Sequence, residues 1–247
     1  MAPNAGPASA PAGDADLAMA TLREWDPDWA EKYLKMVNNP WTNGILSVKD
    51  IELFCLGITA ACTNLDEPGM RRHMRGALRA GATRTEILII LKGAAMLALH
   101  SCSVGAPILL EEARTAGVKL SKQGKDGPTP FCDAFRERGM WNAAWDPSFE
   151  VDPVWTDQFF SAASSIYSGG IFTPKFIELL SIAIDASITH MYAPGTRRHI
   201  QGALKAGASM EEIMEVLKLC VSCVWHAQCV RRGLWTGREP KTVRKTV

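Results

Sequence analysis

The side chains best suited to chemistry in this sequence occur in pairs, and the two members of each pair are separated by 126 positions. Histidine and glutamate can give or take a proton, and arginine and lysine can bind a carboxylate. Such a set suits proton transfer on a substrate that carries a negative charge. The pairs are His73/His199, Glu86/Glu212, His100/His226, Arg72/Arg198 and Lys92/Lys218.

The constant spacing reflects an internal repeat. Residues 49–104 and 175–230 align without a gap and are identical at 24 of 56 positions. A repeat of this length indicates two copies of one structural unit of roughly 100 residues each. The expected division is a leader at 1–20, a first repeat at 21–118, a linker at 119–138, a second repeat at 139–236 and a basic tail at 237–247.

Local signals in each repeat predict helices, and no segment shows the alternation of a strand. Ser47 precedes an apolar run at helical spacing, which is typical of a helix start. The following helix is expected over Met70–Ala80, and Gly81 stands where a left-handed residue ends it, as Gly207 does in the second copy. The predicted fold is all-α, with two tandem helical repeats in a pseudo-two-fold relation.

The third helix of each repeat is predicted to be long. Thr83 and Glu86 form a capping box, and apolar residues keep helical spacing from there to Pro107. Ser209 and Glu212 repeat the box in the second copy. Each glutamate therefore has a structural interpretation, as part of a helix cap, beside a functional one.

Composition excludes several classes of function. The net charge is +1 without a basic stripe, so no nucleic-acid partner is expected. Lys92 interrupts the apolar run at 87–99, so no membrane partner is expected either. The first residues lack the features of a secretory signal. The seven cysteines are an odd number without disulfide spacing, which is typical of reduced thiols in a cytoplasmic protein.

The residues around the first pair of histidines resemble the carboxymuconolactone decarboxylase family, whose fold is that of alkylhydroperoxidase D-like proteins. The resemblance rests on a histidine, a Gly-Ala-Leu-x-Ala-Gly-Ala-Thr/Ser segment and a Glu-Ile pair that opens the long helix. These are His73, residues 76–83, Glu86 and Ile87 in the first repeat, with Gly105–Pro107 as the expected helix end, and His199, residues 202–209, Glu212 and Ile213 in the second.

The resemblance implies an enzyme that acts on a small carboxylated lactone or unsaturated acid from aromatic-ring breakdown. Decarboxylation, isomerisation and lactone or ester hydrolysis stay open, because each draws on proton transfer. The family's ring-shaped assemblies imply a homo-oligomer, and no cofactor is expected. The candidate catalytic residues are His199, Glu212, His226, His73, Glu86 and His100, and the candidate substrate-binding residues are Arg72, Arg198, Lys92, Lys218 and Cys223.

These candidates also have structural interpretations. The first two histidines can be hydrogen-bonded within a helix pair, and the second two can occupy the core or an interface. One arginine of each Arg-Arg pair is expected to face solvent, while the other can pair with Glu52 or Glu178. The second repeat is preferred as the active one because it holds more polar side chains. They are Asp185, His190, Tyr192, Glu215 and Cys223.

The cysteines offer alternative chemistry. Redox members of the resembling family place two cysteines 12 and 15 residues after the glutamate, whereas Cys220 and Cys223 stand about one turn earlier. The alternative functions are a thiol-dependent peroxidase using Cys220, Cys223 and His226, or a non-catalytic oligomeric binding protein. No metal site is expected in the protein, because these three residues and Cys229, which have the composition of a ligand set, point over roughly half of the helix circumference.

Overall fold

The structure is a computed structural model that describes residues 20, 22–119, 126–167 and 169–231, and the backbone alone for residues 167 and 224–231. Within these ranges the chain forms the α-helices α2 to α13 and one short 3-10 helix, residues 20 and 22–25 are also helical, and no strand is present. The expected all-α class is therefore confirmed.

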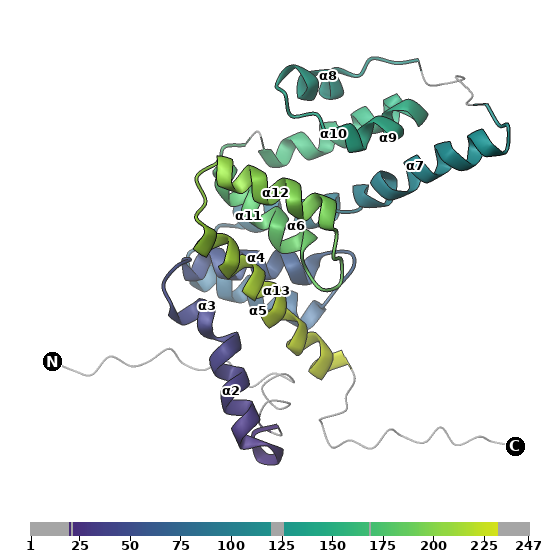
Figure 1. Ribbon diagram of the computed structural model, residues 1–247. Coiled ribbons are helices and arrows are strands. Elements are labelled where there is room, and N and C mark those ends of the chain that lie inside the picture. Colours follow the sequence, from purple (N-terminus) through teal and green to yellow (C-terminus); the bar gives the residue numbers. More distant parts are fainter. Residues whose placement is uncertain (1–19, 21, 120–125, 168, 232–247) are drawn as a thin grey trace, which may run out of the picture.

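Each repeat contributes a core unit of three successive helices (Figure 1). In the first repeat these are α4 (Val48–Ala60), α5 (Glu67–Arg79) and α6 (Arg84–Met96). In the second they are α11 (Pro174–Asp185), α12 (Ala193–Lys205) and α13 (Met210–Arg231). The remaining helices are α2 (Pro27–Val37), α3 (Asn39–Thr42), α7 (Leu99–Thr115), α8 (Pro130–Glu137), α9 (Asp146–Val151) and α10 (Pro153–Tyr167), with the 3-10 helix at Ala143–Trp145.

The boundaries of the core helices follow from cap chemistry that both repeats share. Glu86 Oε2 accepts a hydrogen bond from the Thr83 amide at 2.6 Å, and Thr83 Oγ1 accepts one from the Glu86 amide at 3.1 Å. Ser209 and Glu212 form the same reciprocal pair. The predicted capping boxes are thus confirmed. The left-handed glycines after α5 and α12 are also present, namely Gly81 with φ of 92° and Gly207 with φ of 86°.

The two units pack around a pseudo-two-fold axis. Helices α4 and α11 contact each other at the centre, and α13 of the second repeat packs onto α4 and α5 of the first. Thr63 and Thr189 occupy equivalent positions, and their hydroxyl oxygens lie 3.4 Å apart, so the axis passes between them. One apolar core, which includes Phe54 and Leu180, fills the interface. As a result, the long helix of each repeat completes the core of the other.

The long helix of the first repeat is broken, and the expectation of one helix ending at Pro107 is wrong. Helix α6 ends at Met96 and α7 begins at Leu99. Between them, the amides of Ala98 and His100 bond to carbonyls three residues earlier, at 3.3 and 3.0 Å, which is a 3-10 turn. Pro107 lies inside α7, where it removes one hydrogen bond without ending the helix. Helix α13 continues through the equivalent positions.

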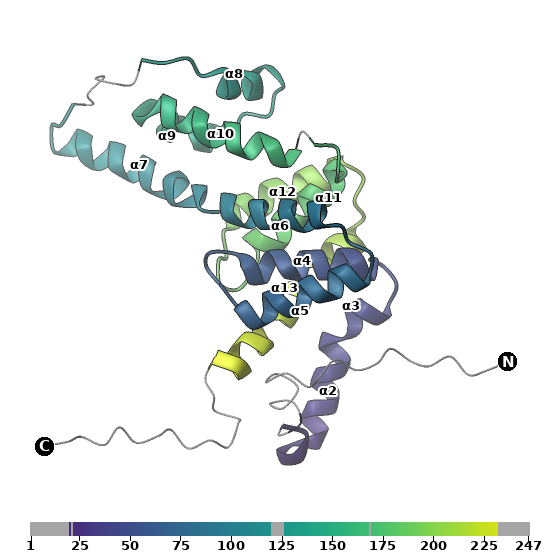
Figure 2. The ribbon, with the colours of Figure 1, turned by 180° about the vertical axis from the view of Figure 1, so that it is seen from behind.

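Helices α7 to α10 form an arm that projects from the core and folds back over it (Figures 1 and 2). Helix α9 packs on α7, α8 packs on α10, and α10 returns to contact α6. The arm has its own small aromatic core around Phe135 and Phe160. Helix α8 lies within the segment 119–138 that the sequence analysis assigned to a linker. The arm therefore covers the end of α6 where the helix is broken.

The stretch 84–115 consists of α6, α7 and the two residues between them, and by length and composition it is apolar enough to cross a membrane. The interruption of the apolar run at Lys92 predicts no such stretch, and that prediction is wrong by length and composition. Four apolar residues of α6 are buried in the core, however, and the helix bends at residues 97–98. Core helices of water-soluble proteins also pass a test of length and composition. These four residues are Ile87, Ile89, Ile90 and Ala94.

A close approach between the first two helices of each unit requires glycine. A Cβ atom on Gly76 would lie 2.5 Å from the carboxylate carbon of Glu52, and one on Gly202 would lie 2.6 Å from that of Glu178. Carbon atoms cannot approach this closely, so the helices would have to separate. The Gly of the shared Gly-Ala-Leu segment therefore makes room for a carboxylate.

We predict that Gly76→Ala and Gly202→Ala each lower the free energy of unfolding by about 1–3 kcal/mol, because the new methyl group overpacks this contact. Gly105→Ala on α7 is the matched control. Its Cβ would meet nothing within 4 Å, so helix propensity should stabilise it by up to about 1 kcal/mol. Urea unfolding followed by circular dichroism measures all three variants. Equal midpoints for Gly76→Ala and Gly105→Ala would contradict the steric account.

Candidate active site

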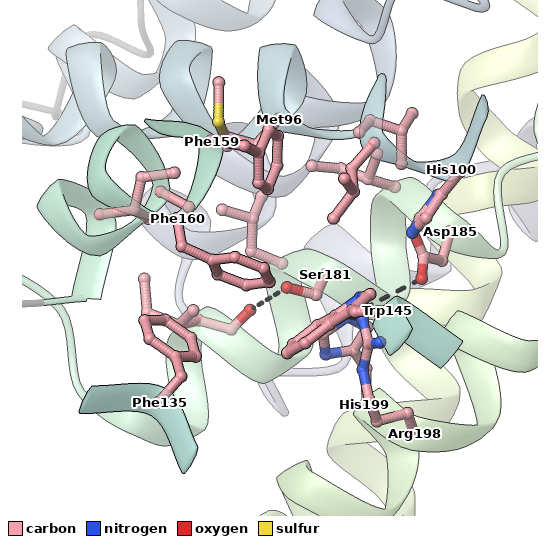
Figure 3. A pocket seen from close by; sticks show the side chains of 18 residues that line it. Met96, His100, Phe135, Trp145, Phe159, Phe160, Ser181, Asp185, Arg198 and His199 are labelled. Atoms are coloured by element: carbon pink, nitrogen blue, oxygen red, sulfur yellow. Dashed lines mark hydrogen bonds and ion pairs between the residues drawn. The ribbon is translucent and has the colours of Figure 1, made fainter. Parts of the chain in front are cut away.

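A cavity of about 110 Å³ lies where the arm meets the second repeat. Its walls come from the end of α6, the start of α7, helices α8 and α10, and the two helices α11 and α12. Figure 3 shows polar side chains gathered at one end and phenylalanines at the other. Both repeats and the arm are thus needed to build it.

The apolar part of the cavity combines aliphatic side chains with a cluster of aromatic rings. Phe135 and Phe160 pack with ring centroids 4.8 Å apart, and the Trp145 ring lies 4.6 Å from that of Phe160. Phe159 completes the wall. Aromatic rings bury a large area and hold a defined shape, so they exclude water from the polar end. This environment strengthens any electrostatic interaction inside the cavity.

Asp185, the last residue of α11, is the central polar group. Its side chain is 2% exposed, and Oδ2 has no hydrogen-bond partner among the described residues. Burial raises the pKa of this carboxyl to about 7, although the Arg198 guanidinium opposes the shift. A buried carboxyl of this kind can hold a proton near neutral pH and transfer it to a nearby proton acceptor.

His199, on α12, is oriented by a carboxylate. Its Nδ1 lies 2.7 Å from Glu178 Oε2, and its Nε2 lies 2.9 Å from Nη2 of Arg198. Arginine can only donate, so Nε2 accepts and the Nδ1–H donates to Glu178. Burial lowers the pKa of His199, which favours the neutral ring. Nε2 stands 3.8 Å from Asp185 Oδ2, so a base and an acid face each other across the cavity.

His100 enters the cavity from the first repeat. Its Nδ1 lies 2.7 Å from His190 Nε2 and 3.7 Å from Asp185 Oδ1, and its ring stacks on Tyr192 at 3.9 Å. Burial, followed by the positive charge possible on His190, lowers the pKa of His100 to about 3. His100 is therefore neutral, and one imidazole of this pair donates to the other.

Two groups of side chains have the composition of metal sites. His100, Asp185 and His190 place their ligand atoms within 4.8 Å of one another, as do Cys55, His73 and Cys223. In the first group, the two imidazole nitrogens are hydrogen-bonded at 2.7 Å. Two nitrogens bound to one tetrahedral ion stand about 3.3 Å apart, given metal–nitrogen bonds of about 2.0–2.1 Å. The nitrogen–nitrogen distance in the first group therefore fits a hydrogen bond better than binding of both imidazoles to one metal ion.

The equivalent place in the first repeat has different chemistry. His73 Nδ1 binds Glu52 Oε2 at 2.8 Å, as its counterpart does. The position of Asp185 is taken by Thr59, however, and Cys223 of α13 approaches His73. A hydrogen bond from Cys55 lowers the pKa of the Cys223 thiol to about 6, and His73 adds to this effect. The two repeats have diverged around the same histidine–carboxylate pair.

The structure places several sequence candidates outside the cavity. Glu86 and Glu212 complete their capping boxes and pair with Lys49 and Lys175, each at 2.8 Å. Those ion pairs and the cap bonds lower the pKa of both carboxyls, against the effect of burial. Neither glutamate lines the cavity or meets a histidine of the pairs. Their structural interpretation accounts for all the contacts that they make.

The other candidates are distributed as follows. Lys92 is exposed on α6, and Lys218 binds Asn39 Oδ1 at 3.0 Å and also Glu215, away from the cavity. The side chain of His226 lies outside the described residues. Cavity-lining candidates are His100, Arg198 and His199, while His73, Arg72 and Cys223 gather in the first repeat.

Sequence reasoning did not select Asp185 or Glu178 as site residues. Glu178 was considered as a partner for arginine, but it binds His199, and Glu52 binds His73. Arg71 is the solvent-facing arginine of the first Arg-Arg pair, and it forms an ion pair with Glu67 at 2.6 Å. A signal for Asp185 was available, because it is the single charge that follows the buried apolar run 179–184.

The fold and the site define a class: an all-α tandem repeat with a buried histidine–carboxylate cavity in one half. Residues 27–118 and 153–229 match the model of the carboxymuconolactone decarboxylase family. A solved structure of a proposed gamma-carboxymuconolactone decarboxylase subunit from Burkholderia xenovorans LB400 is 31% identical, covers 86% of each chain and superposes with a TM-score of 0.76. Curated proteins yield no match. This chain belongs to the carboxymuconolactone decarboxylase family.

The buried carboxyl predicts a pH-dependent stability. The unfolded state has the ordinary pKa of 3.8 and the native state about 7, so folding favours the protonated form. Stability from this group is complete below pH 4 and is lost as pH rises towards 7, by about 2–4 kcal/mol. Asp185→Asn should abolish this loss. Urea midpoints at pH 5 and pH 8 measure it, and an unchanged pH slope in the variant would contradict the raised pKa.

Proposed function

We propose that this protein is an enzyme that moves a proton at carbon on a small carboxylated lactone or unsaturated acid. The proposed acid–base groups are Asp185 and His199, and Arg198 binds a carboxylate of the substrate. Membership in the decarboxylase family supports this class of substrate, and so does the decarboxylase subunit to which the chain is similar. Aromatic-ring breakdown yields compounds of this chemistry.

One observation carries the proposal. A carboxyl with an unpartnered oxygen and an imidazole nitrogen stand 3.8 Å apart in a cavity whose other walls are mainly aromatic and aliphatic side chains. A guanidinium lies beside both. Acid, base and anion-binding group thus converge on one small volume, as proton transfer on a bound carboxylate requires.

The geometry assigns a task to each group. Arg198 is positioned by its hydrogen bond to His199 and by the Trp145 ring, whose centroid is 5.4 Å from the guanidinium carbon. It can exchange the histidine contact for a substrate carboxylate. His199 Nε2 is then free to take a proton from carbon, and Glu178 stabilises the imidazolium that forms. Protonated Asp185 can deliver a proton to the neighbouring carbon.

The same groups serve decarboxylation without a cofactor. In a conjugated lactone acid, the bond between carbon and the departing carboxylate breaks, and CO2 leaves. The electron pair enters the conjugated system, and Asp185 protonates the carbon that receives it. The aromatic walls exclude water, which favours charge dispersal in the transition state over charge on the carboxylate.

The thiol contacts argue against a peroxidase that uses Cys220 and Cys223 as its pair. The Cys220 thiol donates to the carbonyl of Ala183 at 3.3 Å, and burial raises its pKa to about 12. A thiol that stays protonated is a poor nucleophile. Acid–base chemistry in the second repeat is therefore the better-supported function.

We predict that Asp185→Asn and His199→Gln each lower kcat by roughly 10²–10⁴-fold on a carboxylated muconolactone, because each removes a proton-transfer group. Arg198→Lys should raise KM by about tenfold or more through loss of the planar two-donor contact. Loss of the substrate's ultraviolet absorbance and release of labelled CO2 report turnover.

Arg197→Lys is the matched control for Arg198→Lys. Arg197 is the adjacent residue on α12, but it is exposed and does not line the cavity. Its KM should stay within twofold of the wild-type value. If Arg197→Lys and Arg198→Lys have the same KM, or if Asp185→Asn and His199→Gln keep full kcat, the proposed roles are wrong.

A further inference from the structure

A second group of reactive side chains lies in the half of the molecule opposite the cavity. Cys55 of α4, His73 of α5 and Cys223 of α13 hold their ligand atoms within 4.8 Å of one another. Their exposed fractions are 0%, 5% and 2%. Two of the helices belong to the first repeat and one to the second, so the cluster joins the repeats.

The donor atoms are of the types that bind thiophilic metal ions. Two thiolate sulfurs and one imidazole nitrogen form the ligand set of known three-ligand zinc sites, which hold the ion with bonds of about 2.3 Å to sulfur and 2.0–2.1 Å to nitrogen. Ligands of such an ion stand about 3.3–3.8 Å apart. Donors already within 4.8 Å reach this spacing by small side-chain rotations.

The surroundings orient the histidine as a ligand. His73 Nδ1 lies 2.8 Å from Glu52 Oε2, so Nδ1–H donates to the carboxylate and the lone pair of Nε2 faces the thiols. Glu52 is itself held by Trp41 Nε1 at 3.3 Å and packs against Gly76. Carboxylates in this position fix the ring tautomer and raise the basicity of metal-bound histidines.

Arg72 also contacts that nitrogen. Its Nη2 lies 3.1 Å from His73 Nε2. The positive charge of the guanidinium also favours the thiolate form of both cysteines. When an ion takes Nε2, the guanidinium can donate to a thiolate sulfur instead, which relieves the charge of the bound sulfurs.

The comparison between repeats shows that the fold does not demand these cysteines. The equivalent positions in the second repeat hold Ser181, His199 and Leu97. There the histidine–carboxylate pair opens onto the cavity, and Leu97 is a buried apolar residue of the cavity wall. Cys55 of the first repeat thus stands where the second has the hydroxyl of Ser181, and Cys223 stands where it has Leu97. Both thiols lie beside His73.

We propose that Cys55, His73 and Cys223 bind one Zn²⁺ ion that ties α13 of the second repeat to α4 and α5 of the first. Glu52 orients the histidine, and a water molecule fills the fourth coordination position. Because the ligands come together only when α13 packs on the first repeat, the ion binds as the chain folds and stabilises the folded state. The ion lies apart from the cavity and takes no part in its chemistry.

The test is the zinc content of the full-length protein, expressed with added zinc and purified without a metal-affinity step. Mass spectrometry of dialysed protein should find about one zinc per chain. Cys55→Ser and Cys223→Ser should each bind less than a tenth of this amount. Cys220→Ser is the matched control, because Cys220 is buried one turn away on α13 and bonds to a carbonyl, and it should keep its zinc.

A second measurement covers variants that fail to fold. Cobalt(II) replaces zinc in the wild-type protein, and thiolate ligands give an intense charge-transfer band in the near ultraviolet that histidine and carboxylate ligands do not give. Its presence supports the two-cysteine site. Zinc that stays bound to both cysteine variants, or cobalt without this band, places the ion elsewhere and overturns the proposal. A metal-free wild-type protein with a Cys55–Cys223 disulfide in its peptide map overturns it as well.

Discussion

The contact on which this structure depends is a hydrogen bond between a largely shielded histidine and a carboxylate of the preceding helix. It occurs twice, as His73 with Glu52 and His199 with Glu178, at 2.8 and 2.7 Å. A partly buried carboxylate needs good hydrogen-bond partners, and the glycine one turn along the histidine helix provides the space for it. This bond fixes the ring tautomer in both repeats, and so decides which nitrogen is available for chemistry.

The pseudo-two-fold arrangement explains how one scaffold can hold two kinds of site. Each histidine is approached by the long helix of the other repeat, so its surroundings are set by residues more than a hundred positions away. In one half that helix brings Cys223, and in the other it brings Leu97 and then His100. Both repeats contain the histidine–carboxylate pair. The long helix contributed by the other repeat determines the surroundings of each pair.

The arm between the repeats has a comparable effect. The 3-10 turn that ends α6 redirects the chain into α7, and α10 then returns to contact α6. Its aromatic side chains line the cavity that also holds Asp185, and burial raises the pKa of that carboxyl. Membership in the carboxymuconolactone decarboxylase family is consistent with this site, although fold alone does not determine a reaction.

The amino-acid sequence by itself determined the all-α class, the tandem repeat and the helix caps. These features depend on neighbours a few residues apart, such as the Thr83–Glu86 box, and the second copy confirmed each signal. It also indicated the family, because the Gly-Ala-Leu segment and its histidine recur in both repeats.

Only the tertiary structure decided which polar residues meet. Glu86 and Glu212 form ion pairs with nearby lysines. Asp185 and His199 line the cavity together with His100, whose helix comes from the other repeat. Burial and charge at these positions depend on packing between distant segments, which local spacing does not encode. The reactivity of each side chain was therefore set by the assembled core.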